Sequence, residues 1–224
     1  MLNPNKIAFI YCYNNEDELN ASIEYVNELT VPDNITVEII AISDQISLTS
    51  GYNNAMNQTD AKYKVYLHQD LKILHKDFIS DIITVFETDA DIGMIGMIGA
   101  KKLDAGATWW FSPELYGRVI DNTRGPHTTL CFNSIYSLYE EVEAVDGLLM
   151  TTQYDVPWRE DIFTGWHYYD LSQAQEFIRA GYKVVIPNQG NESWCYHDAG
   201  HGSQAGGFEE FKSVFINEYM QNRT

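Results

Sequence analysis

Residues 6–13 have the sequence KIAFIYCY, an unbroken apolar and aromatic run of strand length. Such a run is typical of a strand that is buried on both faces, as in a parallel sheet. Asn15 follows as a good helix N-cap, with Glu18 three positions later as its capping-box partner. Apolar residues then recur at helical spacing, at Leu19, Ile23, Val26 and Leu29. The segment therefore predicts a buried strand, a tight turn and an amphipathic helix.

The same alternation continues along the first hundred residues. We expect a second buried strand over residues 35–42, a helix over 48–56, a strand over 63–67, a helix over 78–86 and a strand over 92–99. Alternating strands and helices form layered α/β folds, so we predict a mainly parallel central sheet with flanking helices. Three glycines recur at every third position of the run 92–99, which indicates close packing rather than a phosphate-binding loop. They are Gly93, Gly96 and Gly99.

The second half of the chain has a weaker pattern. Residues 101–137 lose their periodicity and are predicted to form a long irregular excursion. Order returns with a strand over 143–151, interrupted by Asp146-Gly147, a helix over 170–180, a strand over 183–187 and a closing helix over 208–219. Because the sequence has no repeat and no clear linker, we predict one domain that spans residues 1–224.

The composition excludes several classes of function. The 224 residues include 14 Lys and Arg against 32 Asp and Glu, and this net charge of −18 repels nucleic acids and anionic lipid surfaces. The longest strongly apolar stretch, residues 92–100, is far shorter than the ~20 residues of a membrane-spanning helix. Cys12, Cys131 and Cys195 lack CxxC spacing and suit a reducing compartment. We expect a cytoplasmic protein without a nucleic-acid partner or a transmembrane segment.

Polar residues gather where the predicted strands end, and open α/β sheets bind their ligands outside the carboxyl ends of the strands. Tyr13 and Asn15 follow the first strand, Asp44 follows the second, and His68-Gln69-Asp70 follows the third. On an extended segment the side chains of His68 and Asp70 leave the same face, where they could ligate one divalent ion. The alternative is an ordinary strand end with a solvated aspartate.

A second cluster of interest lies between residues 158 and 170. Four aromatic residues stand next to His167 and to Asp170, which is able to cap the following helix. They are Trp158, Trp166, Tyr168 and Tyr169. Aromatic faces can bind the apolar faces of sugar rings, but the same residues could equally form the edge of a core. Glu160 and Asp161 are alternatives to Asp170 as a general base, and spacing does not choose between them.

In this order the segments resemble family 2-like glycosyltransferases of the GT-A fold, from Lys6 to about Gly200, with a bacterial LHQD-signature subgroup as the nearest match. The resemblance implies that the family's DxD metal motif falls on His68-Gln69-Asp70, with the last aspartate kept as Asp70. It also implies that Asp146-Gly147 is the family's DG, which borders the donor sugar. The implied donor-binding residues are Tyr13, Asn15, Asp44, Asn53, His68 and Asp146.

The resemblance extends to the metal site and the catalytic base. The late segment Trp194-Cys195-Tyr196-His197 is similar to the one whose histidine completes the metal site, so Asp70 and His197 are the implied ligands of Mn²⁺ or Mg²⁺. The family's acidic pair should fall near residues 165–171, where Asp170 is the only carboxylate and therefore the implied base. Trp109 and Trp166 would flank the acceptor.

The implied reaction is the metal-assisted transfer of a glycosyl group from a nucleotide-sugar to a saccharide or other hydroxyl acceptor, with a UDP-sugar as the first choice of donor. Two other functions stay open. A non-catalytic protein of the same fold would keep the aromatic platform and bind a carbohydrate or a nucleotide-sugar. A metal-dependent hydrolase or nucleotidyltransferase would use the same Asp and His residues for different chemistry.

Overall fold

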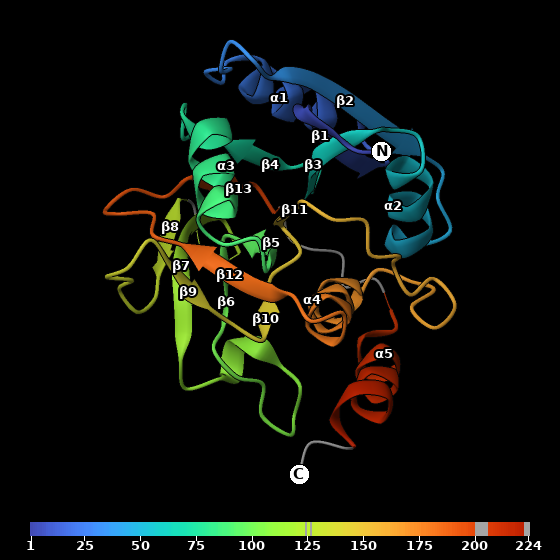
Figure 1. Ribbon diagram of the computed structural model, residues 1–224. Coiled ribbons are helices and arrows are strands. Elements are labelled where there is room, and N and C mark those ends of the chain that lie inside the picture. Colours follow the sequence, from blue (N-terminus) through green and yellow to red (C-terminus); the bar gives the residue numbers. More distant parts are fainter. Residues whose placement is uncertain (124, 126, 200–205, 222–224) are drawn as a thin grey trace.

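The computed structural model describes residues 1–123, 125, 127–199 and 206–221. Its central sheet has seven strands, and all except β11 and β9 run in one direction, which confirms the predicted mainly parallel sheet (Figure 1). The order across this sheet is β2 (Thr36–Ser43), β1 (Asn3–Tyr13), β3 (Ala61–Leu67), β11 (Leu149–Thr152), β5 (Ile92–Gly96), β12 (Lys183–Pro187) and β9 (Tyr139–Glu141).

The strand β1 is buried on both faces, as its apolar run predicts. Ile7, Phe9 and Tyr11 belong to one core cluster, and Ala8 and Ile10 on the opposite face belong to a second. Helices α1 (Glu16–Asn27) and α3 (Phe78–Thr88) supply apolar side chains to the first cluster. Helices α2 (Leu48–Met56) and α4 (Tyr169–Arg179) supply them to the second, and Figure 1 shows the two pairs on different sides of β1.

A second, smaller sheet has six strands. In order, its strands are β10 (Ala144–Val145), β6 (Ile98–Ala100), β7 (Leu115–Asp121), β13 (Cys195–His197) and β4 (Leu71–Ile73), with β8 (Thr128–Cys131) paired to β7. The last elements of the described residues are α5 (Phe208–Phe215) and a π-helical turn (Ile216–Met220), which cover part of the first core. Among the helices of the described residues, none has the length and apolar composition needed to cross a membrane.

The second sheet corrects three predictions. Residues 101–137 are not simply irregular, because they contain β7, β8 and a 3-10 turn (Trp109–Phe111). The predicted strand over 92–99 is two strands in different sheets, β5 and β6. The one over 143–151 is divided near the predicted interruption at Asp146-Gly147, but its two parts, β10 and β11, belong to different sheets. Most of these strands have two to five residues, and β7 is largely half-buried, so neither length nor strict alternation marked them.

The helix starts agree with the sequence only in part. The Oδ1 atom of Asn15 accepts from the backbone N–H groups of Asp17 and Glu18 at 3.1 and 3.4 Å, which confirms the N-cap of α1. Glu18 does not complete a capping box, because its carboxylate accepts a hydrogen bond from Gln69 instead. The N-cap position of helix α4 is Tyr168, whose side chain makes no capping hydrogen bond, and Asp170 is the second residue of the helix.

The three glycines of the run 92–99 are packing positions, as predicted. A Cβ at Gly93 would lie 2.5 Å from the ring of Phe177, and one at Gly96 would lie 2.5 Å from the side chain of Val145. At Gly99 the neighbour is backbone: a Cβ would lie 3.0 Å from the Ala144 carbonyl carbon and closer still to its oxygen. A backbone neighbour cannot rotate away, so Gly99 fixes the distance between β6 and β10.

We therefore expect Gly99→Ala to lower the free energy of unfolding by about 3 kcal/mol, because the added methyl group must push two paired strands apart. Gly206→Ala is the control, since a Cβ there meets nothing within 4 Å, and it should change stability by less than about 0.5 kcal/mol. Urea denaturation followed by circular dichroism measures both. Equal stability of the two variants would contradict this account of the sheet.

Candidate metal centre and its two cavities

The pairing of short strands brings together side chains from three parts of the chain. His68 and Asp70 lie between β3 and β4, at the point where the chain leaves the central sheet for the second sheet. His197 is the last residue of β13, directly opposite Leu71 of β4 and Asp121 of β7. The carboxyl ends of β3, β7 and β13 and the amino end of β4 thus meet at one place, which brings the predicted residues Asp70 and His197 together.

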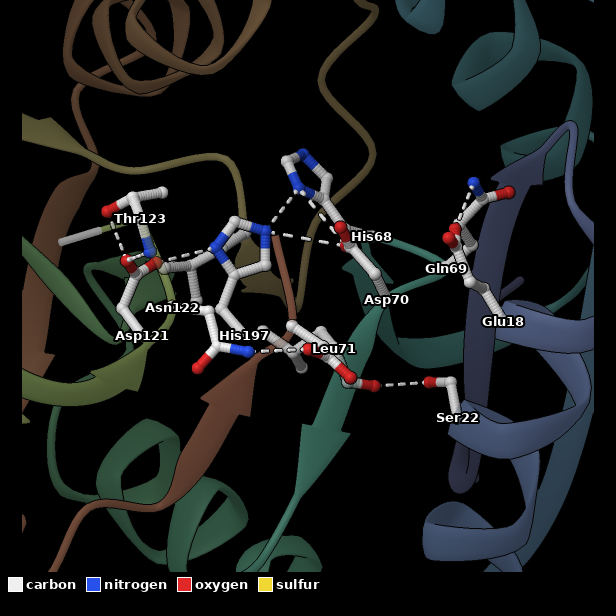
Figure 2. Close-up of polar contacts among 12 residues, drawn as sticks. Glu18, Ser22, His68, Gln69, Asp70, Leu71, Asp121, Asn122, Thr123 and His197 are labelled. Carbon is white, nitrogen blue, oxygen red and sulfur yellow. Dashed lines mark hydrogen bonds and ion pairs between the residues drawn. The ribbon is translucent and has the colours of Figure 1, made fainter. Parts of the chain in front are cut away.

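His68, Asp70 and His197 form a candidate metal centre (Figure 2). The Nδ1 atom of His68 lies 3.3 Å from Nε2 of His197, which lies 3.4 Å from Oδ1 of Asp70. The third separation, from His68 Nδ1 to Asp70 Oδ1, is 4.0 Å. These separations allow one ion to lie within bonding distance of all three atoms, and two imidazoles with a carboxylate are a common ligand set. The residues therefore fit a divalent metal, and His68, assigned to the donor from the sequence, is part of the set.

Asp121 supports this centre and was not identified from the sequence. Its Oδ2 atom lies 3.0 Å from Nδ1 of His197, and its side chain is only 7% exposed. A carboxylate that accepts from one ring nitrogen directs the other nitrogen toward the metal. Asp121 falls in the stretch that was predicted to be irregular. Its position at the end of a strand, two residues after the buried Val119, is the feature from which it could have been identified.

The electrostatics of the centre favour a proton on His197. Burial by itself lowers the pKa of His197, but hydrogen bonds to Asp121 and Asp70 outweigh it and raise the pKa to about 10. Burial and the neighbouring His197 lower the pKa of His68, so this second imidazole is neutral. Because a metal ligand must offer a lone pair, His197 would have to release the proton on Nε2 in order to hold a metal ion.

Gln69, the middle residue of the triplet, fixes the loop after β1. Its Oε1 atom accepts from the backbone N–H groups of Asn14 and Asn15 at 2.8 and 3.1 Å. Its Nε2 group donates to Asn14 Oδ1 at 2.9 Å and to Glu18 at 2.8 Å, a contact visible in Figure 2. The amide therefore makes four hydrogen bonds that tie the β1–α1 loop to the metal centre.

Two cavities meet at the metal centre. The first, called the β1 cavity, has a volume of about 420 Å³ and is lined among others by Tyr13, Gln69 and Asp70. The second, called the α4 cavity, has a volume of about 300 Å³ and includes in its lining Trp109, Asp146, Asp170 and His197. His68 and Trp166 line both. The three residues of the candidate metal centre thus lie at the boundary between the two cavities: Asp70 lines the β1 cavity, His197 lines the α4 cavity, and His68 lines both.

Three predicted donor contacts lie outside both cavity linings. Asn15 is the exposed N-cap of α1, and exposed Asp44 has a left-handed backbone (φ 56°) and accepts from Ser43 Oγ at 3.0 Å. The side chain of Asn53 is bound to the backbone of Trp158 by two hydrogen bonds of 2.9 Å, one in each direction. Asn53 therefore has a clear structural role, since it joins α2 to the segment before α4.

Asp170 lies in the α4 cavity beside Asp146. Its Oδ2 atom accepts from the backbone N–H of Gly147 at 3.0 Å. Burial, with the nearby Asp146 carboxylate as the second cause, raises the pKa of Asp170 to about 7. A carboxyl group with this pKa can both take up and release a proton near neutral pH.

The alternative bases of the sequence lie elsewhere. Asp161 makes a bidentate ion pair with Arg159 at 2.8 and 2.9 Å, and both Glu160 and Asp161 are exposed outside the linings of the two described cavities. Of the two predicted acceptor residues, Trp109 is 5% exposed and Trp166 is 42% exposed. The α4 cavity thus brings together Asp170 and the two tryptophans, but neither Glu160 nor Asp161.

Comparison with protein families matches nearly the whole chain. Residues 8–219 match a family described as the glycosyltransferase like family. No curated protein matches the chain.

Solved structures add matches at the level of the fold. A mannosyltransferase from Pyrobaculum calidifontis in complex with GDP-Man and Mn²⁺ is 10% identical, with a TM-score of 0.51, over 85% of this chain and 59% of its own. Residues 1–349 of S. aureus TarS are 10% identical, with a TM-score of 0.51, over 87% and 60%. The same fragment with UDP is 9% identical, with a TM-score of 0.51, over 86% and 60%. The likeness confirms the GT-A-like fold, and the chain spans about three fifths of the length of these structures.

We expect Asp121→Asn to weaken Mn²⁺ binding about tenfold, because the neutral amide no longer holds His197 and its charge in place. Isothermal titration calorimetry without nucleotide measures the affinity. Asp198→Asn is the matched control: this carboxylate adjoins His197 in sequence but pairs with Lys72 at 3.1 Å, and its loss should change the affinity less than about twofold. Equal losses in both variants would mean that general charge, not the orientation of His197, governs binding.

Proposed function

The chain belongs to the glycosyltransferase-like family, and from this premise we propose that it transfers a glycosyl group from a nucleotide-sugar donor to a hydroxyl of a saccharide acceptor, assisted by a divalent cation. The observation that carries the proposal is that the three residues of the candidate metal centre line two different cavities. Asp70 faces the β1 cavity, His197 faces the α4 cavity, and His68 faces both. Donor and acceptor would therefore occupy different cavities and meet at the metal.

The β1 cavity is the proposed donor site. Tyr13 lies at the end of β1, where ligands of α/β sheets bind, and the loop behind it is held by Gln69. We propose Asn15, Asp44 and Asn53, which lie outside the cavity lining, as further donor contacts, and Asp146, which lines the adjoining α4 cavity, as a contact of the donor sugar where the donor meets the acceptor. The matched structures with GDP-Man and UDP support a nucleotide-linked donor, and a UDP-sugar is our first choice.

The metal would be held by Asp70 and His197, with His68 as a third ligand. A bound Mn²⁺ or Mg²⁺ supplies positive charge that stabilises the departing nucleoside diphosphate. The neutral imidazole of His68 faces the same space, and Asp121 keeps His197 oriented. The positive charge of the metal is needed because, in the part of the chain that the structure describes, neither cavity is lined by Lys or Arg.

Asp170 is the proposed catalytic base. It would take the proton from the acceptor hydroxyl in the α4 cavity, where Trp109 and Trp166 offer aromatic faces to a sugar ring. The hydrogen bond from the Gly147 N–H holds one carboxylate oxygen in place. We also propose a cytoplasmic location, supported by three unpaired cysteines.

Two rival functions have their own outcomes. A non-catalytic binding protein would bind nucleotide-sugars without turnover, and a hydrolase or nucleotidyltransferase would release free phosphate or a nucleotidylated product. A thermal-shift panel of UDP-, GDP-, CMP- and dTDP-sugars, with and without Mn²⁺, followed by product analysis, distinguishes them. The proposed function expects a metal-dependent shift with one donor and release of the nucleoside diphosphate.

We expect Asp70→Ala to abolish the Mn²⁺-dependent part of that thermal shift and of donor turnover, because the change removes a ligand and its negative charge. Asp161→Asn is the control, since its carboxylate is paired with Arg159 outside both cavities. A variant at Asp70 that keeps its full metal dependence would exclude this carboxylate from the metal centre.

We expect Asp170→Asn to lower kcat about 100-fold or more while donor affinity is unchanged, because the base acts only on the acceptor proton. The raised pKa of Asp170 sets the sign of the pH dependence: below about pH 7 the carboxyl is protonated and inactive, so kcat rises with pH and levels off above 7. Rates from about pH 5.5 to about pH 8.5 at saturating donor test this. If Asp170→Asn turned over normally and Glu160→Gln did not, the base would belong to the upstream acidic segment.

A further inference from the structure

His68 occupies the position at which the family's metal motif has a carboxylate. Its surroundings indicate that this histidine affects which metal ion the centre prefers. We propose that the centre is a two-histidine, one-carboxylate site that prefers transition-metal ions such as Co²⁺, Zn²⁺ and Mn²⁺ over Mg²⁺, and that Tyr169 positions His68 for this role. The inference deepens the proposed function, on which its biological use rests. It concerns the identity of the metal, which the reaction alone does not determine.

The orientation of His68 is determined by a buried hydroxyl. Its Nε2 atom lies 2.6 Å from the hydroxyl of Tyr169, whose side chain is 5% exposed. When Nε2 carries the proton and donates to this oxygen, the lone pair is on Nδ1. That atom is the one that faces His197 at 3.3 Å and Asp70 at 4.0 Å.

The two imidazoles are held in the same way. The outer nitrogen of each ring, the one that faces away from the centre, has a buried oxygen partner: Tyr169 for His68 and Asp121 for His197. Metal-binding histidines are characteristically held by such an outer partner. An ordinary solvated strand end needs neither contact, so the paired arrangement supports ligation through both inner nitrogens.

Gly147 makes the contact with Tyr169 possible. A Cβ at this position would lie 2.6 Å from Cζ of Tyr169 and closer still to its hydroxyl oxygen. Tyr169 is the first residue of α4, and Gly147 lies just before β11, so the two meet only after the sheet and the helix have packed. The glycine therefore leaves the space through which the hydroxyl reaches His68.

The kinds of ligand atom in the centre determine which metal ion it prefers. Mg²⁺ takes oxygen ligands and resists losing water, whereas imidazole nitrogen binds the later divalent transition metals more strongly. Two of the three donor atoms here are nitrogens. Replacement of one nitrogen by a carboxylate should therefore reduce the preference, whatever the sugar substrate.

The test is metal binding to the EDTA-treated full chain without nucleotide. Calorimetry with Co²⁺, Mn²⁺ and Mg²⁺ should give a wild-type affinity for Mn²⁺ at least about 100-fold above that for Mg²⁺, with Co²⁺ tighter still. His68→Asp should reduce the Mn²⁺/Mg²⁺ ratio at least about tenfold. Electron spin-echo envelope modulation of bound Mn²⁺ should detect two coupled imidazole nitrogens in the wild type and one in this variant.

Tyr169→Phe isolates the positioning role, since the ring stays and only the hydroxyl is lost. It should weaken Mn²⁺ binding about tenfold and change the nitrogen coupling of the His68 ring. Tyr52→Phe is the matched control: its ring packs 6.1 Å from that of Tyr169, and its buried hydroxyl has no hydrogen-bond partner among the described residues. This control should keep the wild-type metal affinity.

Several results would overturn the inference. They are no Mn²⁺ or Co²⁺ binding, equal wild-type affinities for Mn²⁺ and Mg²⁺, a single coupled nitrogen in the wild type, or equal effects of Tyr169→Phe and Tyr52→Phe. Failure of the proposed function has a different signature. Selective Mn²⁺ binding without any turnover of nucleotide-sugars would exclude the transferase and leave the metal assignment intact.

Discussion

The site depends on the pairing of β13 with two strands at once. His197 lies opposite Leu71 of β4 and opposite Asp121 of β7, so a three-residue strand sets the distances from its imidazole to both carboxylates. A shift of register by one residue would turn His197 to the other face of the sheet and dissolve the centre. The backbone N–H of Asp198 donates to the carbonyl of Asp70 at 2.9 Å, which holds that register at its functional end.

The segment His68-Gln69-Asp70 joins the two sheets as well as the two cavities. It leaves the central sheet at β3 and enters the second sheet at β4, and its side chains contact both the second sheet and the loop after β1. His68 and Asp70 turn toward His197, and Gln69 turns toward the loop after β1. One amide side chain therefore connects the loop that borders the β1 cavity to the segment that carries His68 and Asp70.

Local signals in the sequence predicted the layers of the fold and some of the site. The apolar run at 6–13, the N-cap at Asn15 and the helical faces are written in neighbouring residues, so the strand and helix pattern of the first hundred residues was predictable. Asp121 and Tyr169 were not predictable as partners of the two histidines, because their roles arise only when strands and helices distant in sequence pack together. The resemblance assigned His68 to the donor, whereas its spacing from Asp70 on an extended segment had already made it a candidate metal ligand, and the structure brings it close to both Asp70 and His197.

The negative charge of the protein affects how the centre would interact with an anionic ligand. A chain with a net charge of −18 repels a nucleoside diphosphate, and Asp146 and Asp170 add negative charge close to the place where it would react. The raised pKa of Asp170 reflects both its burial and this local repulsion. The protonated ring of His197 lies between the carboxylates of Asp70 and Asp121, and a divalent ion held by Nε2 would replace the proton on that nitrogen. This exchange would raise the net charge of the centre by one unit at the boundary between the two cavities.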